Sequence, residues 1–174
     1  IISYIISANN NIPRIKGIID RISKNYGKEI EWNGEKYYTF PTVEELKDVS
    51  VEDYRKLGAG FRDVRLYETV QAVLDKKVDL EKLHKEKDFN KVREELLCLS
   101  GVGPKVADCI LLFSCGRQEV FPVDVWVERV MKKLYFKEAS VSKKEILKYS
   151  IENFGSDAGI IQQHLFYNIR ENLI

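Results

Sequence analysis

The feature that most constrains this chain is the segment Leu-Ser-Gly-Val-Gly-Pro-Lys at positions 99–105. Helical patterns of apolar residues flank it over 88–98 and 104–115, so the segment has to join two helices by a tight turn. Glycine takes up positive φ angles without steric cost and leaves the backbone N–H groups of a turn uncovered. Gly101 and Gly103 therefore predict a hairpin, either a plain connector between packed helices or a cradle for a phosphate group.

Lys105 and Asp124 are the candidate reactive groups near this hairpin. Lys105 follows Pro104, a residue favoured in the first turn of a helix, where partial positive charge favours the neutral amine that a nucleophile needs. Asp124 follows Phe-Pro-Val and precedes a helical pattern over 124–134. Taken singly, the lysine is typical of a solvated helix start and the aspartate of an N-cap. Their order after one hairpin, on either side of an apolar helix, favours a shared role for the two residues over two unrelated surface positions.

The segment around the hairpin, together with Phe-Pro-Val-Asp124, resembles the helix-hairpin-helix and Pro-Asp motif of base-excision DNA glycosylases, most closely the 8-oxoguanine DNA glycosylases. The resemblance covers essentially the whole chain. It implies a mainly α-helical fold of two lobes with a cleft between them. Residues 1–174 would be the helical region, with the helix-hairpin-helix at about 88–115 and without the family's N-terminal sheet lobe. It also implies an enzyme that excises 8-oxoguanine and, through a Lys105 Schiff base, acts as an AP lyase.

The resemblance assigns roles to single residues around the reacting sugar and base. Lys105 would be the nucleophile and Asp124 its electrostatic partner. The flipped base would lie between Cys109 and Phe166, and Gln162 would read its pairing edge. Taken without the resemblance, Cys109 and Phe166 are typical core residues and Gln162 is typical of a surface.

The hairpin would act through its backbone. By resemblance, its N–H groups hold DNA phosphates without reading sequence, and the residues concerned are Gly101, Val102, Gly103 and Lys105. Carbonyl oxygens of the same turn would bind a monovalent cation, and these come from Leu97, Leu99 and Val102. Backbone binding suits a chain with 28 basic and 27 acidic residues, because that balance gives no general attraction to nucleic acid.

A second group of residues would act on the strand opposite the lesion. The resemblance assigns Asn9, Arg14 and Arg62 to the orphaned cytosine, and Phe61 to an aromatic wedge that fills the gap left by the flipped base. Taken alone, Asn9 is equally explained as a helix cap and the arginines as a solvated face. The chain departs from its relatives at Trp126, where they carry a histidine that touches phosphate, so that contact is lost or passes to the indole N–H.

Cysteine and histidine positions bear on cofactors. Cys98, Cys109 and Cys115 lack the spacing of a zinc site, and His84 and His164 have no partner at recognisable spacing. No cysteine follows Cys115 in the chain, so the iron–sulfur loop of related endonucleases is missing. We expect an enzyme that requires no cofactor beyond the monovalent cation and contains no iron–sulfur cluster. Its partner would be double-stranded DNA with an oxidised purine, bound by a monomer.

No apolar run in the chain approaches the roughly 18 residues of a membrane-spanning helix, and no leader sequence is recognisable. We expect a cytoplasmic protein, associated with the nucleoid in a bacterium, or a nuclear protein in a eukaryote. Two other functions stay open on the residues alone. One is a noncatalytic helix-hairpin-helix module that grips DNA, and the other is a related glycosylase for a different damaged or mismatched base.

The remaining sequence predicts mostly helices. An apolar N-terminal helix ends before Asn9, and apolar periodicity places others over 14–26, 62–75, 79–84, 142–154 and 158–172. Two capping boxes, Thr42-Val-Glu-Glu45 and Ser50-Val-Glu-Asp53, each predict the start of a short helix. Between them and the helix over 14–26, alternating residues around Asn33-Gly34 predict a β-hairpin too small to define the fold.

Overall fold

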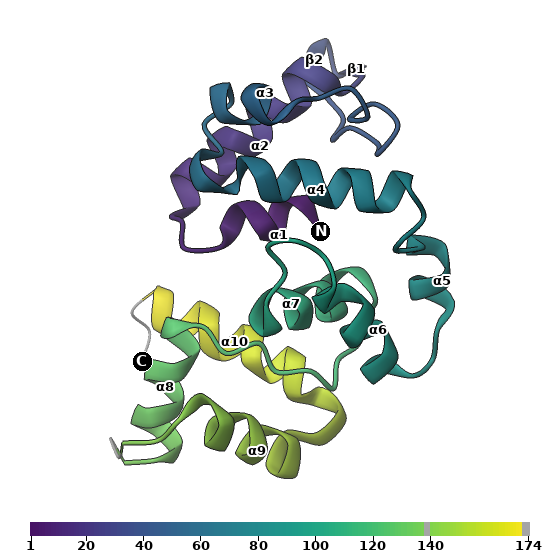
Figure 1. Cartoon of the computed structure of the whole chain (residues 1–174). Helices are drawn as coiled ribbons and strands as arrows, with labels where there is room; N and C mark the ends of the chain where they lie inside the picture. Colours follow the sequence, from purple (N-terminus) through teal and green to yellow (C-terminus); the bar gives the residue numbers. More distant parts are fainter. Residues whose placement is uncertain (138–139, 172–174) are drawn as a thin grey trace. The chain divides into compact units, whose positions relative to one another are not determined.

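The computed structural model describes residues 1–137 and 140–171, and the chain is built mainly from α-helices (Figure 1). It divides into two compact units, the first Ile1–Lys87 with Glu94–Val102, the second Asp88–Arg93 with Gly103–Ile174. The division passes through one helix, which therefore belongs partly to each unit. Within the described residues, no helix is long and apolar enough to cross a membrane.

The first unit holds five helices, the end of a sixth, one 3-10 turn and one β-hairpin. The elements are α1 Ile2–Ser7, α2 Ile12–Tyr26, β1 Glu29–Trp32, β2 Glu35–Tyr38, α3 Val51–Lys56, η1 Gly60–Arg62, α4 Asp63–Leu74 and α5 Leu80–Lys85. These bounds confirm the helices expected over 14–26, 62–75 and 79–84, with small shifts at the ends.

Local chemistry explains where α2 begins and which face it buries. Asn11 is its N-cap, and the Asn11 side chain accepts a hydrogen bond from the Arg14 backbone N–H at 3.0 Å. Pro13 lies in the first turn, where its missing N–H costs nothing. One turn apart, Ile18 and Ile22 are fully buried, so the predicted isoleucine face packs into the core of the first unit.

The short hairpin confirms the expectation at Asn33-Gly34. β1 and β2 pair antiparallel, with Trp32 opposite Glu35. Asn33 and Gly34 take φ angles of 52° and 76°, the left-handed conformation that two-residue hairpin turns require.

The two capping boxes have different outcomes. Ser50 begins α3 as expected, with both reciprocal hydrogen bonds of the box formed. Thr42 and Glu45 form the same bonds, at 2.8 Å and 3.3 Å, but only turns follow, so the helix predicted there was wrong. The Leu46 N–H is shared between the carbonyls of Thr42 and Val43, and the next helix already begins after Ser50. The Lys47 N–H donates to Glu44 and the Val49 N–H to Leu46, bonds that span three residues, so the segment continues as turns and not as an α-helix.

The second unit contains the start of α6 and the rest of the helices. Its elements are α6 Phe89–Leu97, α7 Pro104–Ser114, α8 Val125–Tyr135, α9 Lys143–Phe154, η2 Gly155–Asp157 and α10 Ala158–Arg170. All were expected from the sequence except η2, and residue 172, the expected end of the last helix, lies outside the described residues.

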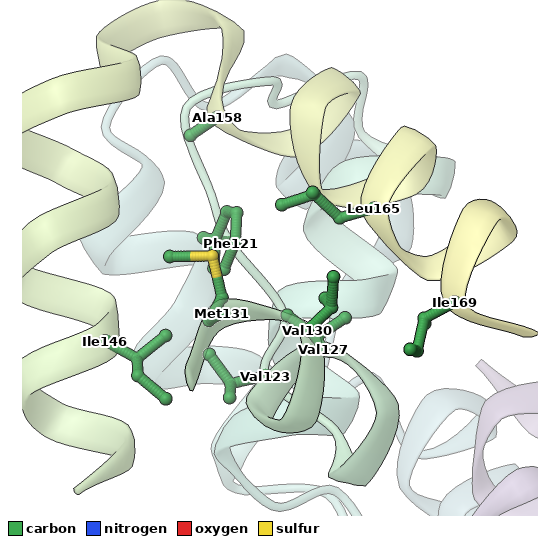
Figure 2. Packing of buried hydrophobic residues seen from close by; sticks show 9 residues of the cluster. All are labelled: Phe121, Val123, Val127, Val130, Met131, Ile146, Ala158, Leu165 and Ile169. Atoms are coloured by element: carbon green, nitrogen blue, oxygen red, sulfur yellow. The ribbon is translucent and has the colours of Figure 1, made fainter. Parts of the chain in front are cut away.

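An apolar core joins α8, α9 and α10 with the segment that leads into α8 (Figure 2). Val127, Val130 and Met131 of α8 are fully buried in it. The other buried members are Phe121, Val123, Ile146, Ala158, Leu165 and Ile169. Burying each large side chain stabilises the fold by about 1.5–3 kcal/mol. The core therefore fixes the start of α8, where Asp124 lies, relative to α10.

Candidate active site

Lys105 occupies the first turn of α7, directly after Pro104. Cys109 follows one helical turn later and is buried. Burial raises the pKa of the Cys109 thiol, whereas the nearby Lys105 amine favours the thiolate and the carboxylates of Asp108 and Asp124 oppose it. Cys109 therefore lies within electrostatic reach of both predicted reactive groups. The structure brings Lys105, Cys109 and Asp124 together within the second unit.

Asp124 is the N-cap of α8, as its N-cap interpretation predicted. Its Oδ1 accepts hydrogen bonds from the backbone N–H groups of Trp126 at 2.9 Å and Val127 at 2.8 Å. Within the described residues, its Oδ2 accepts none. Capping thus fixes the orientation of the carboxylate through one oxygen and leaves the other available to a positively charged group.

The two α10 residues of the predicted base pocket differ in their surroundings. Gln162 is only 4% exposed, so the interpretation as a surface residue was wrong. Its Oε1 accepts a hydrogen bond from Gln163 Nε2 at 2.6 Å. Phe166 is half-buried and packs against the core of the second unit. Both side chains are therefore held by their surroundings, which suits a rigid pocket wall.

A glycine sets how closely α10 approaches α7. A Cβ atom at Gly159 would lie 2.4 Å from Leu112 Cδ1, closer than carbon atoms can pack. The Gly159 N–H also donates to the Gln118 carbonyl at 2.7 Å. Gly159 thereby fixes the start of α10, three residues before Gln162.

An open cavity of about 620 Å³ lies beside these helices, and no motif in the sequence indicates it. Leu112 and Phe113 of α7 line one part of it, and Gly159, Gln163 and Tyr167 of α10 another. Cys109 and Phe166 do not line it. Phe113 lies one turn beyond Cys109 on α7, and this i+4 spacing is the signal that could have predicted its place.

The first unit carries the residues assigned to the strand opposite the lesion, and Phe61 is the aromatic residue among them. Phe61 lies in η1 and is 57% exposed. Arg62 Cζ lies 4.2 Å from the centroid of its ring. An exposed aromatic ring on a short turn is the arrangement expected of a wedge.

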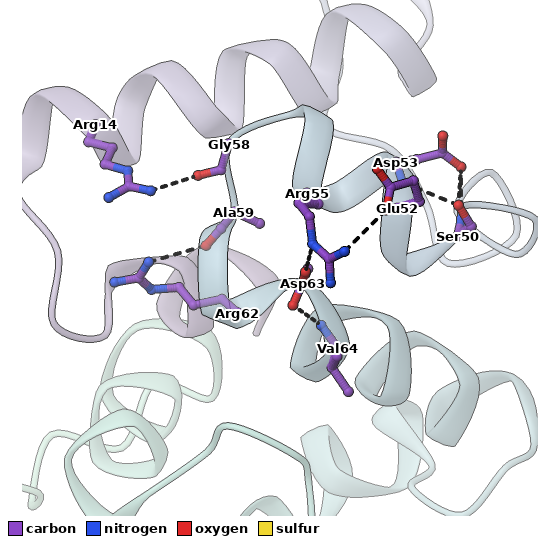
Figure 3. Close-up of polar contacts among 10 residues, drawn as sticks. All are labelled: Arg14, Ser50, Glu52, Asp53, Arg55, Gly58, Ala59, Arg62, Asp63 and Val64. Carbon is purple, nitrogen blue, oxygen red and sulfur yellow. Dashed lines mark hydrogen bonds and ion pairs between the residues drawn. The ribbon is translucent and has the colours of Figure 1, made fainter.

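Arg62 is buried, which corrects its interpretation as part of a solvated face. It is 1% exposed. Its Nε donates to the Ala8 carbonyl at 2.8 Å and its Nη2 to the Asn9 carbonyl at 2.7 Å. Its Nη1 donates to the Ala59 carbonyl at 3.2 Å (Figure 3). In this structure the Arg62 guanidinium therefore binds backbone carbonyls of its own unit, and its predicted contact with cytosine stays a prediction.

Asn9 and Arg14 lie on either side of the same turn. Asn9 is exposed, with a left-handed backbone at φ 48°, and Asn11 rather than Asn9 caps α2. Asn9 directly follows Ala8, the C-cap of α1, and its left-handed backbone is typical of the residue that ends a helix, so the cap interpretation holds at the end of α1 and not at the start of α2. Arg14 is exposed and its Nη2 donates to the Gly58 carbonyl at 3.1 Å, as Figure 3 shows. Arg14 thus reaches the loop that carries Phe61.

Ion pairing holds the start of α4 directly after this loop. Arg55 Nε donates to Asp63 Oδ2 at 2.8 Å, and the Val64 backbone N–H donates to Asp63 Oδ1 at 2.7 Å (Figure 3). Burial raises the pKa of Asp63, but the hydrogen bonds from Val64 and Arg55 outweigh it and leave this pKa below its usual value. The Asp63 carboxylate is therefore charged, and both of its oxygens accept a hydrogen bond.

The glycine-marked hairpin is fixed to α4 of the first unit. Gly101 has a φ of 81°, as predicted, and the Thr69 hydroxyl donates to the Ser100 carbonyl at 3.0 Å. Gly103 has a φ of −90°, so the expectation of a left-handed residue there was wrong. A Cβ atom at Gly103 would meet nothing within 4 Å. Its backbone is therefore open to a ligand.

The three hairpin carbonyls predicted to bind a monovalent cation differ in whether they accept a hydrogen bond. Leu99 O accepts a hydrogen bond from the Val102 N–H at 3.1 Å. Within the described residues, the carbonyls of Leu97 and Val102 accept none, so both keep lone pairs for a cation. Among those residues there is also no group of three His, Cys, Asp or Glu side chains placed to hold a metal ion.

The comparisons with known proteins agree with this fold. The sequence model of the HhH-GPD superfamily of base excision DNA repair proteins matches residues 2–155. The chain belongs to this superfamily.

Two relatives show how far the similarity extends. A probable N-glycosylase/DNA lyase of Methanothermobacter thermautotrophicus is 33% identical over 99% of this chain and 60% of its own length. The structure of the Clostridium acetobutylicum 8-oxoguanine glycosylase/lyase, in complex with double-stranded DNA containing cytosine opposite 8-oxoG, is 45% identical. The match covers 99% of this chain and 59% of the Clostridium chain, with a TM-score of 0.93. The chain thus spans about 60% of the length of these relatives.

Proposed function

We propose that this chain carries the catalytic helical region of a bifunctional 8-oxoguanine DNA glycosylase with AP lyase activity. The observation that carries the proposal is the placement of Lys105 in the first turn of α7 and of Asp124 at the N-cap of α8, both within electrostatic reach of Cys109. Supporting it, the Clostridium protein of similar fold is named an 8-oxoguanine glycosylase/lyase.

The chemistry follows from what an amine and a fixed carboxylate can do to a deoxyribose. As the bond between C1′ and the base breaks, positive charge develops on the sugar, and the Asp124 carboxylate stabilises it. The neutral Lys105 amine forms a bond to C1′ while the electron pair of the broken bond leaves with the base. The sugar ring then opens to a Schiff base, which promotes loss of a C2′ proton and release of the 3′ phosphate. This β-elimination is the lyase step.

Recognition of the lesion uses the second unit. The extruded base would stack between Cys109 and Phe166, with Gln162 at its pairing edge. The raised pKa of the Cys109 thiol, caused first by burial, fits an apolar pocket wall. Because Gln162 and Phe166 are held by their surroundings, they lose little conformational entropy on binding.

Support for the duplex uses the first unit. Phe61 would fill the gap left by the extruded nucleotide, while Asn9, Arg14 and Arg62 would contact the cytosine left unpaired. The open backbone at Gly103 allows a DNA phosphate to approach the hairpin N–H groups. Such contacts position the duplex without reading its sequence.

Borohydride trapping tests the proposal. Borohydride reduces a Schiff base to a stable amine, so the wild-type protein should become covalently attached to a duplex with 8-oxoguanine opposite cytosine. Lys105→Gln should give no adduct while still binding the duplex. Binding without any wild-type adduct would favour a noncatalytic module. Adducts only with other damaged or mismatched bases in a panel of otherwise identical duplexes would favour a related glycosylase.

We also propose that the reaction needs no cofactor beyond a monovalent cation at Leu97, Leu99 and Val102, and that the protein acts as a monomer on DNA. It would work where the DNA is, in the nucleoid or the nucleus. Activity should therefore survive chelation of divalent metals by EDTA, and the protein should elute as a monomer in gel filtration. Loss of activity with EDTA would contradict the cofactor proposal.

A further inference from the structure

Arg65 has no role in the site described above. It is the third residue of α4 and its side chain is exposed. Within residues 1–137 and 140–171, its guanidinium makes no ion pair or hydrogen bond, whereas Arg55 on the neighbouring helix is paired with Asp63. An exposed and unpaired guanidinium has all its donors available to a ligand.

The Arg65 side chain nevertheless has a defined position. Its Cζ lies 5.5 Å from the centroid of the Phe61 ring. Its stem packs on the hairpin, because a Cβ atom at Gly101 would lie 2.9 Å from Arg65 Cδ and 3.1 Å from Arg65 Cβ. The Arg65 side chain is therefore held between Phe61, the predicted wedge, and Gly101 of the hairpin, and these three residues belong to the first unit.

The charge around Arg65 favours an anion. Arg62 and Arg65 both lie near the Phe61 ring, with their Cζ atoms 4.2 Å and 5.5 Å from its centroid. Burial lowers the pKa of Arg62, and repulsion from Arg14 and Arg65 adds to this effect. The Asp63 carboxylate accepts hydrogen bonds from Arg55 and from the Val64 N–H, and it makes no ion pair with Arg65. A guanidinium binds phosphate oxygens with two parallel hydrogen bonds.

We propose that Arg65 binds a phosphate of the DNA backbone beside the hairpin. Contacts with Phe61 and Gly101 hold the Arg65 side chain in place. The inference rests on the proposed function, since it takes duplex DNA as the ligand. Arg65 would act as a binding residue that adds to affinity for damaged and undamaged duplex alike, because a phosphate contact carries no sequence information.

The dependence of duplex affinity on salt measures this contact. Each neutralised phosphate contributes about −0.9 to the slope of log K against log salt concentration. Arg65→Gln should therefore make the slope shallower by about 0.9, to the same extent for lesion-containing and undamaged duplexes. Arg65→Lys keeps the charge and should restore most of the slope.

Lys24→Gln serves as the charge-matched control. Lys24 lies at the far end of α2 from Arg14, about 15 Å along the helix at 1.5 Å per residue. Its exposed ion pair with Asp20 contributes little to stability, so this variant changes net charge and little else. Its salt slope should equal that of the wild type.

The outcomes separate this inference from the proposed function. A wild type that is trapped by borohydride, together with an unchanged slope for Arg65→Gln, would overturn the role of Arg65 and leave the enzyme assignment intact. An equal loss of slope in Lys24→Gln would also overturn it, because the effect would then come from net charge. A wild type that binds no duplex would overturn both proposals.

Discussion

The guanidinium of Arg62 donates two hydrogen bonds to the carbonyl oxygen of Ala8, from Nε at 2.8 Å and from Nη2 at 2.5 Å. The two residues are 54 positions apart in the chain, so these bonds connect the end of α1 to the loop that carries Phe61. The same Nη2 reaches the Asn9 carbonyl, and Asn9 has a left-handed backbone. The buried Arg62 thus connects the segment that contains Asn9 with the 3-10 turn that contains Phe61, and both residues are predicted to contact DNA.

Removing this arginine should destabilise the first unit. Arg62→Ala leaves the carbonyls of Ala8 and Asn9 without their charged donor, and we expect a loss of roughly 3 kcal/mol in the free energy of unfolding, measured by urea denaturation. Arg14→Ala is the control, because the exposed Arg14 side chain makes one hydrogen bond within the described residues, to the Gly58 carbonyl, and its loss should cost less than about 1 kcal/mol. Similar losses of unfolding free energy in the two variants would show that the buried bonds to Ala8 and Asn9 stabilise the protein no more than one exposed hydrogen bond.

Asp124 combines capping with charge, and two substitutions separate these roles. Asp124→Asn keeps an acceptor for the N–H groups of Trp126 and Val127, so its free energy of unfolding should stay within about 0.5 kcal/mol of the wild type. Asp124→Ala should lose about 1 kcal/mol. Both should slow base removal by roughly a factor of 100 or more in single-turnover assays, because both lack the carboxylate charge. Wild-type rates in Asp124→Asn would exclude an electrostatic role.

Gly103 distinguishes a phosphate cradle from a plain connector. A Cβ atom there would meet no protein atom and the φ of −90° suits any residue, so Gly103→Ala should fold, with a loss of about 1 kcal/mol or less because Gly103 is the N-cap of α7. If a DNA phosphate approaches this backbone closely, the added methyl group should weaken duplex binding in anisotropy titrations. Unchanged affinity in a stably folded Gly103→Ala would favour the connector.

Cys109 should make stability depend on pH in the alkaline range. Burial raises the pKa of its thiol in the folded protein above the usual value of 9.0. The unfolded chain then ionises first, so the contribution of Cys109 is fully present below about pH 9 and is lost as pH rises through the folded pKa. The urea concentration at the midpoint of unfolding should fall between pH 8 and pH 10 in both proteins, and by a smaller amount in Cys109→Ala than in the wild type. Identical falls in the two proteins would contradict a raised pKa.

Local signals in the sequence predicted most elements of this fold. Pro104 marked the start of α7, Asn33-Gly34 the hairpin turn and Ser50 the start of α3, because each depends on residues close in the chain. Thr42 shows the limit of such signals. Its capping box forms, yet the hydrogen bonds that follow span three residues instead of four, and a capping box does not determine that pattern.

The surroundings of the site residues could not be predicted in the same way. The sequence gives no sign that Arg62 is buried, because its partners Ala8 and Asn9 lie far away in the chain. Gln162 is buried for a similar reason, since the close approach of α10 depends on Gly159 against Leu112. Spacing could place residues on the same helix face, but burial depends on which other helix covers that face.

The amine that attacks the sugar can be identified directly. After borohydride reduction on a duplex with 8-oxoguanine opposite cytosine, digestion of the adduct and mass spectrometry locate the modified residue. We predict the added mass on the peptide that contains Lys105. An adduct on any other lysine, or on none, would contradict the assignment of Lys105 as the nucleophile.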